Sequence, residues 1–227
     1  MGTDFGARLL GLLLPERCLA CGAGDELLCG ACRRELVVLR GTVCARCGCP
    51  TAWPVERCGE CAGRRIPFAS ARAAVAYDGP ARSLVTAWKE RGLRRVAGLA
   101  AELVTDVVAR PRADALAFVP GAGERVGWRG VDTAEALARA LAGVWELPVT
   151  PLLARTRRVR PQRGLPREAR RANVHDAFRA AAAAPRAVAL VDDVYTTGAT
   201  VSAAARELKK AGARTVHVVT FARTVRS

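Results

Sequence analysis

Residues 188–200 constrain the fold of this chain more than any other segment, because they predict a strand, a turn and a helix in direct succession. The apolar run 187–191 is typical of a strand that is buried on both faces. It leads into Asp192-Asp193 and a Thr-Thr-Gly-Ala-Thr turn, after which residues 199–211 show the periodicity of an amphipathic helix. A buried strand followed by a helix is typical of parallel βαβ units, which bind ligands at the carboxyl ends of their strands.

The same alternation of strands and helices extends through the C-terminal two thirds of the chain. Strands are predicted at residues 71–77, 115–119, 149–153, 187–191 and 215–221, and helices at 80–108, 133–141 and 199–211. A break in the first of these helices is expected near Gly92. We therefore predict an α/β domain over residues 67–227, with a parallel sheet and helices on both of its faces.

The turn after the acid pair has the groups needed to hold a phosphate. Gly198 allows close approach of the backbone, and the amides that follow from Ala199 onward lie at the positive end of a helix dipole. Hydroxyl groups come from Thr196, Thr197 and Thr200. Such a cradle beside two carboxylates fits a ribose 5-phosphate, with Asp192 and Asp193 on the ribose hydroxyls. The alternative, solvated acids before an ordinary capped helix, fits the order of these elements less well.

Eight of the nine cysteines form four Cys-x-x-Cys pairs in the first part of the chain. The pairs are Cys18/Cys21, Cys29/Cys32, Cys44/Cys47 and Cys58/Cys61. Each pair places two sulfurs on one side of a tight turn, and two pairs complete a tetrahedral site for Zn²⁺. We therefore predict a double zinc-ribbon module at residues 1–66, in which two structural Zn²⁺ ions replace a hydrophobic core.

The sequence leaves alternatives open within this module. The pairs can combine sequentially, which we expect, or crossed, with the first pair joining the third. Redox chemistry is less consistent with so many pairs, and the module contains no histidine that would indicate catalytic zinc. Cys49 is the unpaired thiol, and a small buried side chain is its expected role.

The formal net charge of +15 is unevenly distributed. Residues 1–66 contain 9 arginines and 7 acidic residues, so the excess of positive charge belongs to the predicted α/β domain. Part of this excess forms an arginine-rich run that contains prolines and glycine and is therefore predicted to be a loop. Its basic residues are Arg155, Arg157, Arg158, Arg160, Arg163, Arg167, Arg170 and Arg171.

Three interpretations of the arginine-rich run compete. A solvated linker is the default. The others are a mobile hood that neutralises a diphosphate, with Arg155, Arg157 and Arg158 as candidates, and a strip that binds nucleic-acid phosphates. The position of the run between two predicted strands, ahead of the acid pair, favours the hood. The aromatic content of 5% provides few stacking platforms for single-stranded DNA.

The whole pattern resembles the ComF/GntX family, whose members join a double zinc ribbon to a type I phosphoribosyltransferase-like domain. The matching residues are the four cysteine pairs, Trp88-Lys89, Gly92, Arg129-Gly130, Arg155, Gln162, Arg170, Asn173-Val174, Phe178 and residues 192–200. The resemblance implies binding of phosphoribosyl diphosphate (PRPP) with Mg²⁺ at Asp192, Asp193 and residues 196–200. It also implies a role in DNA uptake during natural competence.

Two features narrow what the resemblance implies. Purine-salvage enzymes of this type usually carry an acidic residue where this chain has Thr196, which argues against hypoxanthine-guanine chemistry. Family members usually have a Pro-Val-Pro-like turn where residues 120–124 are Pro-Gly-Ala-Gly-Glu, so diphosphate binding is less expected than ribose-phosphate binding. We expect a phosphoribosyltransferase with an unidentified acceptor. The alternative is a non-catalytic adaptor or single-stranded DNA-binding component that acts with a DNA-uptake helicase.

The sequence also bears on location. It contains no apolar run of the about 18 residues that a membrane-spanning helix requires. The apolar stretch 5–14 is short and lacks both a preceding basic segment and a small-residue cleavage site. We therefore expect no membrane insertion and a cytoplasmic location.

Overall fold

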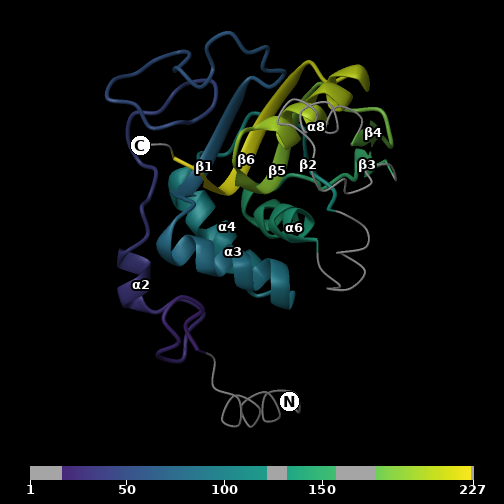
Figure 1. Cartoon of the computed structure of the whole chain (residues 1–227). Coiled ribbons are helices and arrows are strands. Elements are labelled where there is room, and N and C mark those ends of the chain that lie inside the picture. The colour runs from purple at the N-terminus through teal and green to yellow at the C-terminus, as the bar shows by residue number, and fades with distance from the viewer. Residues whose placement is uncertain (1–16, 122–131, 157–176, 226–227) are drawn as a thin grey trace, which may run out of the picture.

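A four-stranded parallel sheet lies at the centre of the computed structural model, which describes residues 17–121, 132–156 and 177–225 (Figure 1). Its strands are β1 (Ser70–Ala76), β2 (Ala115–Phe118), β5 (Ala187–Tyr195) and β6 (Thr215–Arg223). They lie in the order β1-β6-β5-β2, and each neighbouring pair is parallel. The predicted parallel sheet is confirmed, with the acid-bearing strand β5 between β2 and β6.

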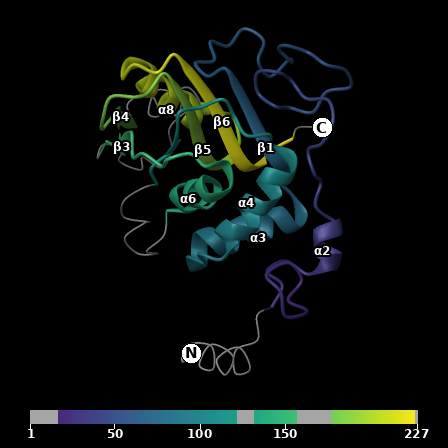
Figure 2. The ribbon, with the colours of Figure 1, turned by 180° about the vertical axis from the view of Figure 1, so that it is seen from behind.

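Helices cover both faces of the sheet (Figures 1 and 2). One face carries α3 (Gly79–Arg91), α4 (Val96–Val107) and α6 (Thr133–Trp145), and the other carries α8 (Ala199–Lys210). Trp88 and Leu141 are buried in the hydrophobic cluster of the first face, and Val201 and Leu208 in that of the second. The predicted α/β architecture with helices on both faces is therefore confirmed.

Local sequence signals set the helix ends that matter for the site. Gly92 ends α3 in the left-handed region with φ 64°, and its amide donates to the Trp88 carbonyl at 3.1 Å. The predicted break between α3 and α4 is thus confirmed. Asp132 caps α6, and its carboxylate accepts from the amides of Ala134 and Glu135 at 3.1 and 3.4 Å. This cap holds the start of α6 beside the end of β2.

The predicted strand at residues 149–153 is wrong in most of its length. Val149 forms only an isolated parallel bridge with Leu116 at the sheet edge. Pro151 follows and has no N–H with which to continue the ladder, so the chain leaves the sheet. The next residues instead form a two-stranded antiparallel sheet, β3 (Leu153–Arg155) with β4 (Phe178–Ala180).

The cysteine-rich part of the chain also covers the exposed edge of the sheet. Val38 pairs with Val75 of β1 in an antiparallel bridge. The Leu39 amide donates to the Ala74 carbonyl at 2.8 Å, and the Ala76 amide donates to the Val37 carbonyl at 2.8 Å. An unpaired edge strand is a template for aggregation, so this segment protects β1 from pairing with other chains.

The two halves of the cysteine-rich part pack on opposite faces of the α/β domain. Cys18 and Cys32, with the short helix α2 (Gly30–Arg34), join the hydrophobic cluster that contains α3 and α4. Cys44 and Cys61 join the cluster that contains α8. The cysteine-rich part therefore shares both cores of the domain. None of the helices in the described segments has the length and apolar character needed to cross a membrane.

Candidate functional site

The eight paired cysteines form two four-sulfur clusters. The first ribbon contains Cys18, Cys21, Cys29 and Cys32, and the second ribbon contains Cys44, Cys47, Cys58 and Cys61. Within each cluster the sulfurs lie within 4.8 Å of one another, so the pairs combine sequentially. In the second ribbon the Sγ–Sγ separation is 3.5 Å for Cys47–Cys58 and 3.9 Å for Cys44–Cys61. A tetrahedral Zn²⁺ with Zn–S bonds of about 2.3 Å requires about 3.8 Å, so both clusters suit structural zinc.

Backbone amides support the sulfurs in the same way in the two ribbons. The Cys29 amide donates to Cys18 Sγ at 3.4 Å, and the Cys58 amide donates to Cys44 Sγ at 3.3 Å. Such hydrogen bonds stabilise a thiolate that binds a metal ion. Cys49 lies outside both clusters and is 9% exposed, and burial raises the pKa of its thiol to about 11. It is the small buried side chain that the sequence predicted.

Asp193, the second residue of the acid pair, is held by residues from two other elements. Its side chain is buried at the end of β5. One carboxylate oxygen accepts from Lys89 Nζ of α3 at 2.7 Å, and the other accepts from the hydroxyl of Thr133 at the start of α6. These contacts use both oxygens of Asp193 within the protein.

The carboxylate of Asp192 differs from that of Asp193 in its hydrogen bonds and in its pKa. One of its oxygens accepts the Asp193 amide at 2.9 Å. Burial and the adjacent Asp193 carboxylate raise the pKa of Asp192 well above its usual value, although Lys89 opposes this shift. A ligand that donates hydroxyl hydrogens to Asp192 would stabilise its ionised form, so this residue is the one suited to a ribose diol.

The turn between β5 and α8, residues 196–200, is termed the phosphate loop below. Gly198 has φ 73°, a backbone conformation that favours glycine, and it is the N-cap of α8 without a side-chain capping bond. A Cβ at this position would lie 2.6 Å from Cζ of the Tyr195 ring. The ring therefore packs against the turn. The Ala199 amide at the start of α8 donates to Thr197 Oγ1 at 3.4 Å, and helix N-termini in general offer further amides to an anion.

Hydrogen bonds to its backbone carbonyl groups also hold the phosphate loop in place. Thr224 Oγ1 donates to the Thr196 carbonyl at 3.2 Å, and Arg64 Nη2 donates to the Thr197 carbonyl at 2.8 Å. The Thr224 amide donates to the Tyr195 carbonyl at 2.9 Å. These bonds fix the backbone of the loop, while the side chains of Thr196, Thr197 and Thr200 are exposed.

The end of β2 forms a second wall of this region. The Gly121 amide donates to the Asp132 carboxylate at 2.7 Å, and burial raises the pKa of Asp132. Arg155 Nη1 donates to the Pro120 carbonyl at 3.3 Å, and its guanidinium lies 5.4 Å from the centroid of the Phe178 ring. Arg155, a predicted hood residue, thus lies at the carboxyl edge of the sheet. Arg157, Arg158 and residues 122–124 of the altered turn lie outside the described residues.

Several residues around the acid pair were not singled out as site residues from the sequence. They are Lys89, Asp132, Thr133, Arg64 and Arg223. Lys89 carried a usable signal, since it is one of three lysines in a chain whose other basic residues are arginines. The others come from elements distant in sequence and carried no comparable signal.

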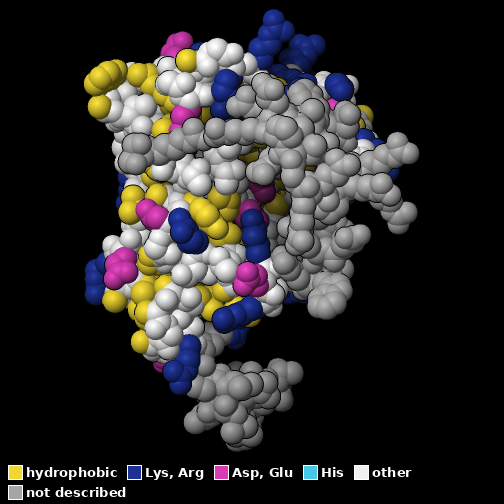
Figure 3. All heavy atoms as spheres, viewed as in Figure 1, with side chains coloured by type: hydrophobic (Ala, Val, Ile, Leu, Met, Phe, Trp, Pro, Cys, Tyr) yellow, Lys and Arg dark blue, Asp and Glu magenta, His cyan; other side chains and the backbone are white. Residues whose placement is uncertain are grey.

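On the face shown in Figure 3, the charges of the described residues give no separate indication of a nucleic-acid strip. In the view of Figure 3 the basic and acidic side chains of the described residues are interspersed over the surface. A nucleic-acid strip would require basic residues to be contiguous along a groove. The run 157–171, which holds most of the clustered arginines, lies outside the described residues.

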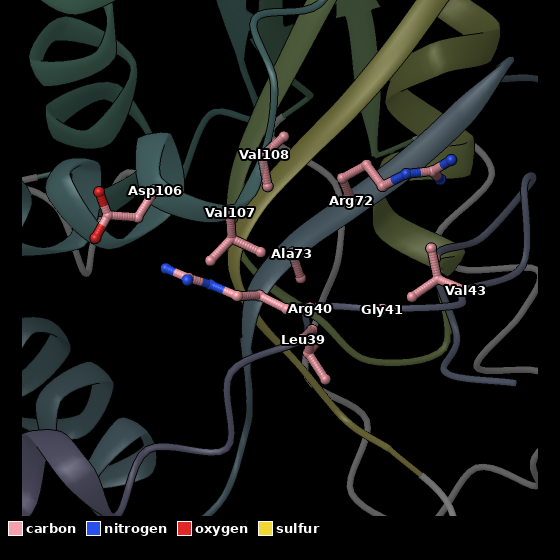
Figure 4. Close-up of a pocket in the computed structure, with 10 residues that line it drawn as sticks. Leu39, Arg40, Gly41, Val43, Arg72, Ala73, Asp106, Val107 and Val108 are labelled. Atoms are coloured by element: carbon pink, nitrogen blue, oxygen red, sulfur yellow. The ribbon is translucent and has the colours of Figure 1, made fainter. Parts of the chain in front are cut away.

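A cavity of about 380 Å³ lies apart from the acid pair, between β1, the end of α4 and the segment that covers β1 (Figure 4). Its walls combine aliphatic side chains, Val43, Val107 and Val108 among them, with the charged residues Arg40 and Asp106. Arg72, which also lines it, donates to the backbone carbonyls of Ala45 and Ala71 at 3.0 and 2.8 Å. These bonds give Arg72 a structural role in docking the second ribbon on β1.

Two solved structures share a distant likeness with part of the chain. One is a glutamine PRPP amidotransferase from B. subtilis in complex with ADP and GMP, 22% identical with a TM-score of 0.38. The other is described as an allosteric regulatory enzyme of purine biosynthesis, 24% identical with a TM-score of 0.36. The matches cover 56% and 55% of this chain, and 25% and 24% of the other chains.

Sequence comparisons cover nearly the whole chain. Residues 9–62 match the model of the double zinc ribbon domain, which supports structural zinc at the two clusters. DNA utilization protein YhgH of Salmonella typhimurium is 30% identical, with 94% of this chain and 100% of the relative covered. Competence protein F of Haemophilus influenzae is 27% identical, with 91% and 96% covered. The protein therefore belongs to the ComF/GntX family, the family of DNA utilization protein YhgH and competence protein F.

Proposed function

We propose that this protein binds a ribose 5-phosphate group, as present in PRPP, at the carboxyl edge of its parallel sheet, and that it acts in DNA uptake or utilization. The observation that carries the proposal is the placement of Asp192 next to the phosphate loop. Asp192 in β5 precedes by a few residues the N-terminus of α8, where Gly198 is the N-cap, and helix N-termini favour anions such as a phosphate. The names of the relatives support the DNA-related role.

In this proposal each part of the site has a separate task. The phosphate loop holds the 5-phosphate through the amides at the start of α8 and the hydroxyls of Thr196, Thr197 and Thr200. Asp192 accepts from the ribose hydroxyls, and Asp193 fixes Lys89 and Thr133 around it. Arg155 of β3, which donates to the Pro120 carbonyl beyond the end of β2, would bind a diphosphate on C1. Arg157 and Arg158 are further candidates for this role and lie outside the described residues. Mg²⁺ would enter with PRPP and offset the charge of its diphosphate.

As an enzyme, the protein would transfer the phosphoribosyl group to an acceptor. The bond between C1 and the diphosphate oxygen breaks, the diphosphate leaves with the bonding electrons, and a nucleophilic atom of the acceptor bonds to C1. Positive charge develops on the ribose ring in the transition state, and ionised Asp192 would stabilise it. Thr196 stands where purine-salvage enzymes have an acid, so the acceptor differs from hypoxanthine and guanine.

One observation favours a second candidate, a non-catalytic adaptor that senses a phosphoribosyl ligand or binds single-stranded DNA beside a DNA-uptake helicase. Both oxygens of Asp193 are engaged by Lys89 and Thr133, so only Asp192 of the pair is suited to a ribose diol. A single ribose contact supports binding but provides less control over the geometry at C1 than two would.

Titration calorimetry with ribose 5-phosphate, and with PRPP and Mg²⁺, tests the binding proposal. We expect Asp192→Asn to weaken both ligands by about tenfold or more, since a hydrogen bond to a charged group contributes about 1.5–3 kcal/mol. Asp106→Asn, an exposed acid of α4, is the matched control and should bind as wild type. Equal affinity of wild type and Asp192→Asn would refute the assignment of the ribose site.

Release of diphosphate from labelled PRPP across a panel of nucleobases separates the two candidates. Turnover supports the enzyme, whereas tight binding without release supports the adaptor. Single-stranded DNA binding is measured separately with an oligothymidylate at several salt concentrations. If DNA lies on the arginine-rich run, alanine at Arg155, Arg157 and Arg158 weakens binding and lowers its salt dependence.

A further inference from the structure

We infer that metal binding at the second ribbon holds the phosphate loop in its ligand-binding conformation, so that the second ribbon, unlike the first, controls the affinity of the site. The inference rests on the proposed function for its ligand. It rests on three contacts of the structure for its mechanism. These contacts run from the cysteine cluster through Arg64, Arg223 and Tyr195 to the turn at Gly198.

The first contact is direct. Arg64 follows the last cysteine of the second ribbon by three residues, and its amide donates to the Cys61 carbonyl at 3.2 Å. Its guanidinium donates to the Glu60 carbonyl at 3.2 Å through Nη1 and to the Thr197 carbonyl at 2.8 Å through Nη2. One side chain of the ribbon therefore bonds the ribbon backbone and the phosphate loop at the same time.

The second contact is buried. Arg223, at the end of β6, is 1% exposed. Its Nη1 donates to the Cys47 carbonyl at 2.6 Å and lies 3.9 Å from Cys47 Sγ, and its Nη2 pairs with Glu60 at 3.1 Å. A buried guanidinium without these partners would carry a large desolvation penalty. The position of Cys47 and Glu60 therefore determines where Arg223 can lie.

The third contact passes from Arg223 to the loop. The guanidinium lies 5.2 Å from the centroid of the Tyr195 ring, and Tyr195 pairs with Arg223 across β5 and β6. Phe68 packs edge-on against the same ring at 6.4 Å between centroids. The far end of the ring fills the space that a side chain at Gly198 would need. A shift of Arg223 is thus transmitted through a close-packed ring to the N-cap of α8.

The first ribbon provides the contrast. Its cysteines pack in the hydrophobic cluster of α3 and α4, on the face opposite α8. Within the described part of the chain, the ion pair of Arg33 with Glu102 of α4 links it to the domain. Arg33 and Arg64 are both partly or fully exposed arginines that connect a ribbon to the domain, but only Arg64 contacts the phosphate loop in the described structure.

The metal matters because the two halves of each ribbon are joined through their thiolates. Loss of the ion removes the cross-link between Cys44/Cys47 and Cys58/Cys61, and small metal domains lose their fold without it. The Cys47 carbonyl and the Glu60 carboxylate would then no longer be held around Arg223. The predicted result is a more mobile phosphate loop with a weaker hold on a phosphate.

Cysteine variants test whether loss of zinc from the second ribbon, and not from the first, weakens ligand binding. Cys29→Ser and Cys58→Ser are matched, since each is the third cysteine of its cluster, is partly buried, and donates its amide to the first cysteine. Each should lower the zinc content by about one ion per chain, measured by native mass spectrometry. We expect Cys58→Ser to weaken ribose 5-phosphate by about tenfold or more, and Cys29→Ser to change it less than about twofold.

Arginine variants test the direct link without removing a metal ligand. Amide hydrogen exchange across residues 195–200 should be about three- to tenfold faster in Arg64→Met than in wild type, and unchanged in Arg33→Met. This readout needs no ligand. If Arg64→Met and Arg33→Met both exchange like wild type, the inference is overturned.

The outcomes separate the inference from the proposed function. If wild type binds neither ribose 5-phosphate nor PRPP, the proposed function is wrong, and the exchange data still show whether the ribbon holds the loop. If wild type binds but Cys29→Ser and Cys58→Ser weaken binding equally, the proposed function stands and the special role of the second ribbon is refuted.

Discussion

Alanine at Gly198 is the sharpest test of how the phosphate loop is built. The residue has φ 73°, which costs an alanine about 1–2 kcal/mol. The added Cβ would also lie 2.6 Å from Cζ of Tyr195, and the ring cannot move easily because it is buried between Phe68 and Arg223. Overpacking of this kind costs about 1–3 kcal/mol. We expect Gly198→Ala to lower the free energy of unfolding by about 2–5 kcal/mol.

Urea denaturation with a double-variant cycle separates the two contributions. Tyr195→Leu removes the far end of the ring, so in the double variant with Gly198→Ala only the backbone cost remains. The two changes should therefore be non-additive by about 1–3 kcal/mol. Gly143→Ala is the control, since a Cβ there, in the last turn of α6, meets nothing within 4 Å, and it should stabilise the protein by up to about 1 kcal/mol. Strict additivity, or a Gly198→Ala cost no larger than the control, would refute the steric argument.

Three further predictions concern charge and metal. The pKa of Asp192 is raised in the folded state, so the folded protein binds more protons than the unfolded chain above about pH 4, and its stability falls as pH rises through the raised pKa. Asp192→Asn should remove this dependence of stability on pH, measured as urea midpoints between pH 4 and 8. An unchanged pH dependence would contradict the raised pKa. Lys89→Met leaves buried Asp193 without its cation and should lower the free energy of unfolding by about 1–3 kcal/mol, measured by urea denaturation. Lys210→Met breaks an exposed ion pair with Glu207 and should lower it by less than about 1 kcal/mol. Native mass spectrometry should show two zinc ions per chain, and one zinc ion per chain would contradict the geometry of two clusters. A strong chelator should remove the zinc and lower the melting temperature of the protein.

Much of the fold was predictable because its signals are local. The apolar run of β5, the amphipathic periodicity of α8 and the break at Gly92 each depend on neighbours in the sequence. The strand at residues 149–153 was mispredicted although Pro151 was visible. Apolar residues there indicate burial, but only the spatial arrangement shows that the chain leaves the sheet for a second, antiparallel pair.

The candidate site also contains both residues that local sequence signals predict and residues that only the tertiary structure brings together. The acid pair and the threonine-glycine turn lie within a few residues of each other and form a recognisable signal. The residues that determine what this pair can do come from far away: Lys89 contacts Asp193 across 104 positions, and Arg223 contacts Cys47 across 176. Spacings of this size carry no periodicity, so no pattern in the sequence indicates them.

The sequence by itself therefore determined the parallel α/β class and the eight cysteines of the two clusters, and it predicted the segment proposed to bind a ribose phosphate, since each is encoded by residue types at short spacing. The tertiary structure decided that the cysteine pairs combine sequentially and that the second ribbon contacts the phosphate loop. It also decided that Lys89 and Thr133 engage both oxygens of Asp193, whereas Asp192 accepts the Asp193 amide. The physical reason is that burial and pairing depend on which elements the sheet order brings together: β1 lies beside β6, and β2 beside β5, although each pair is far apart in the sequence.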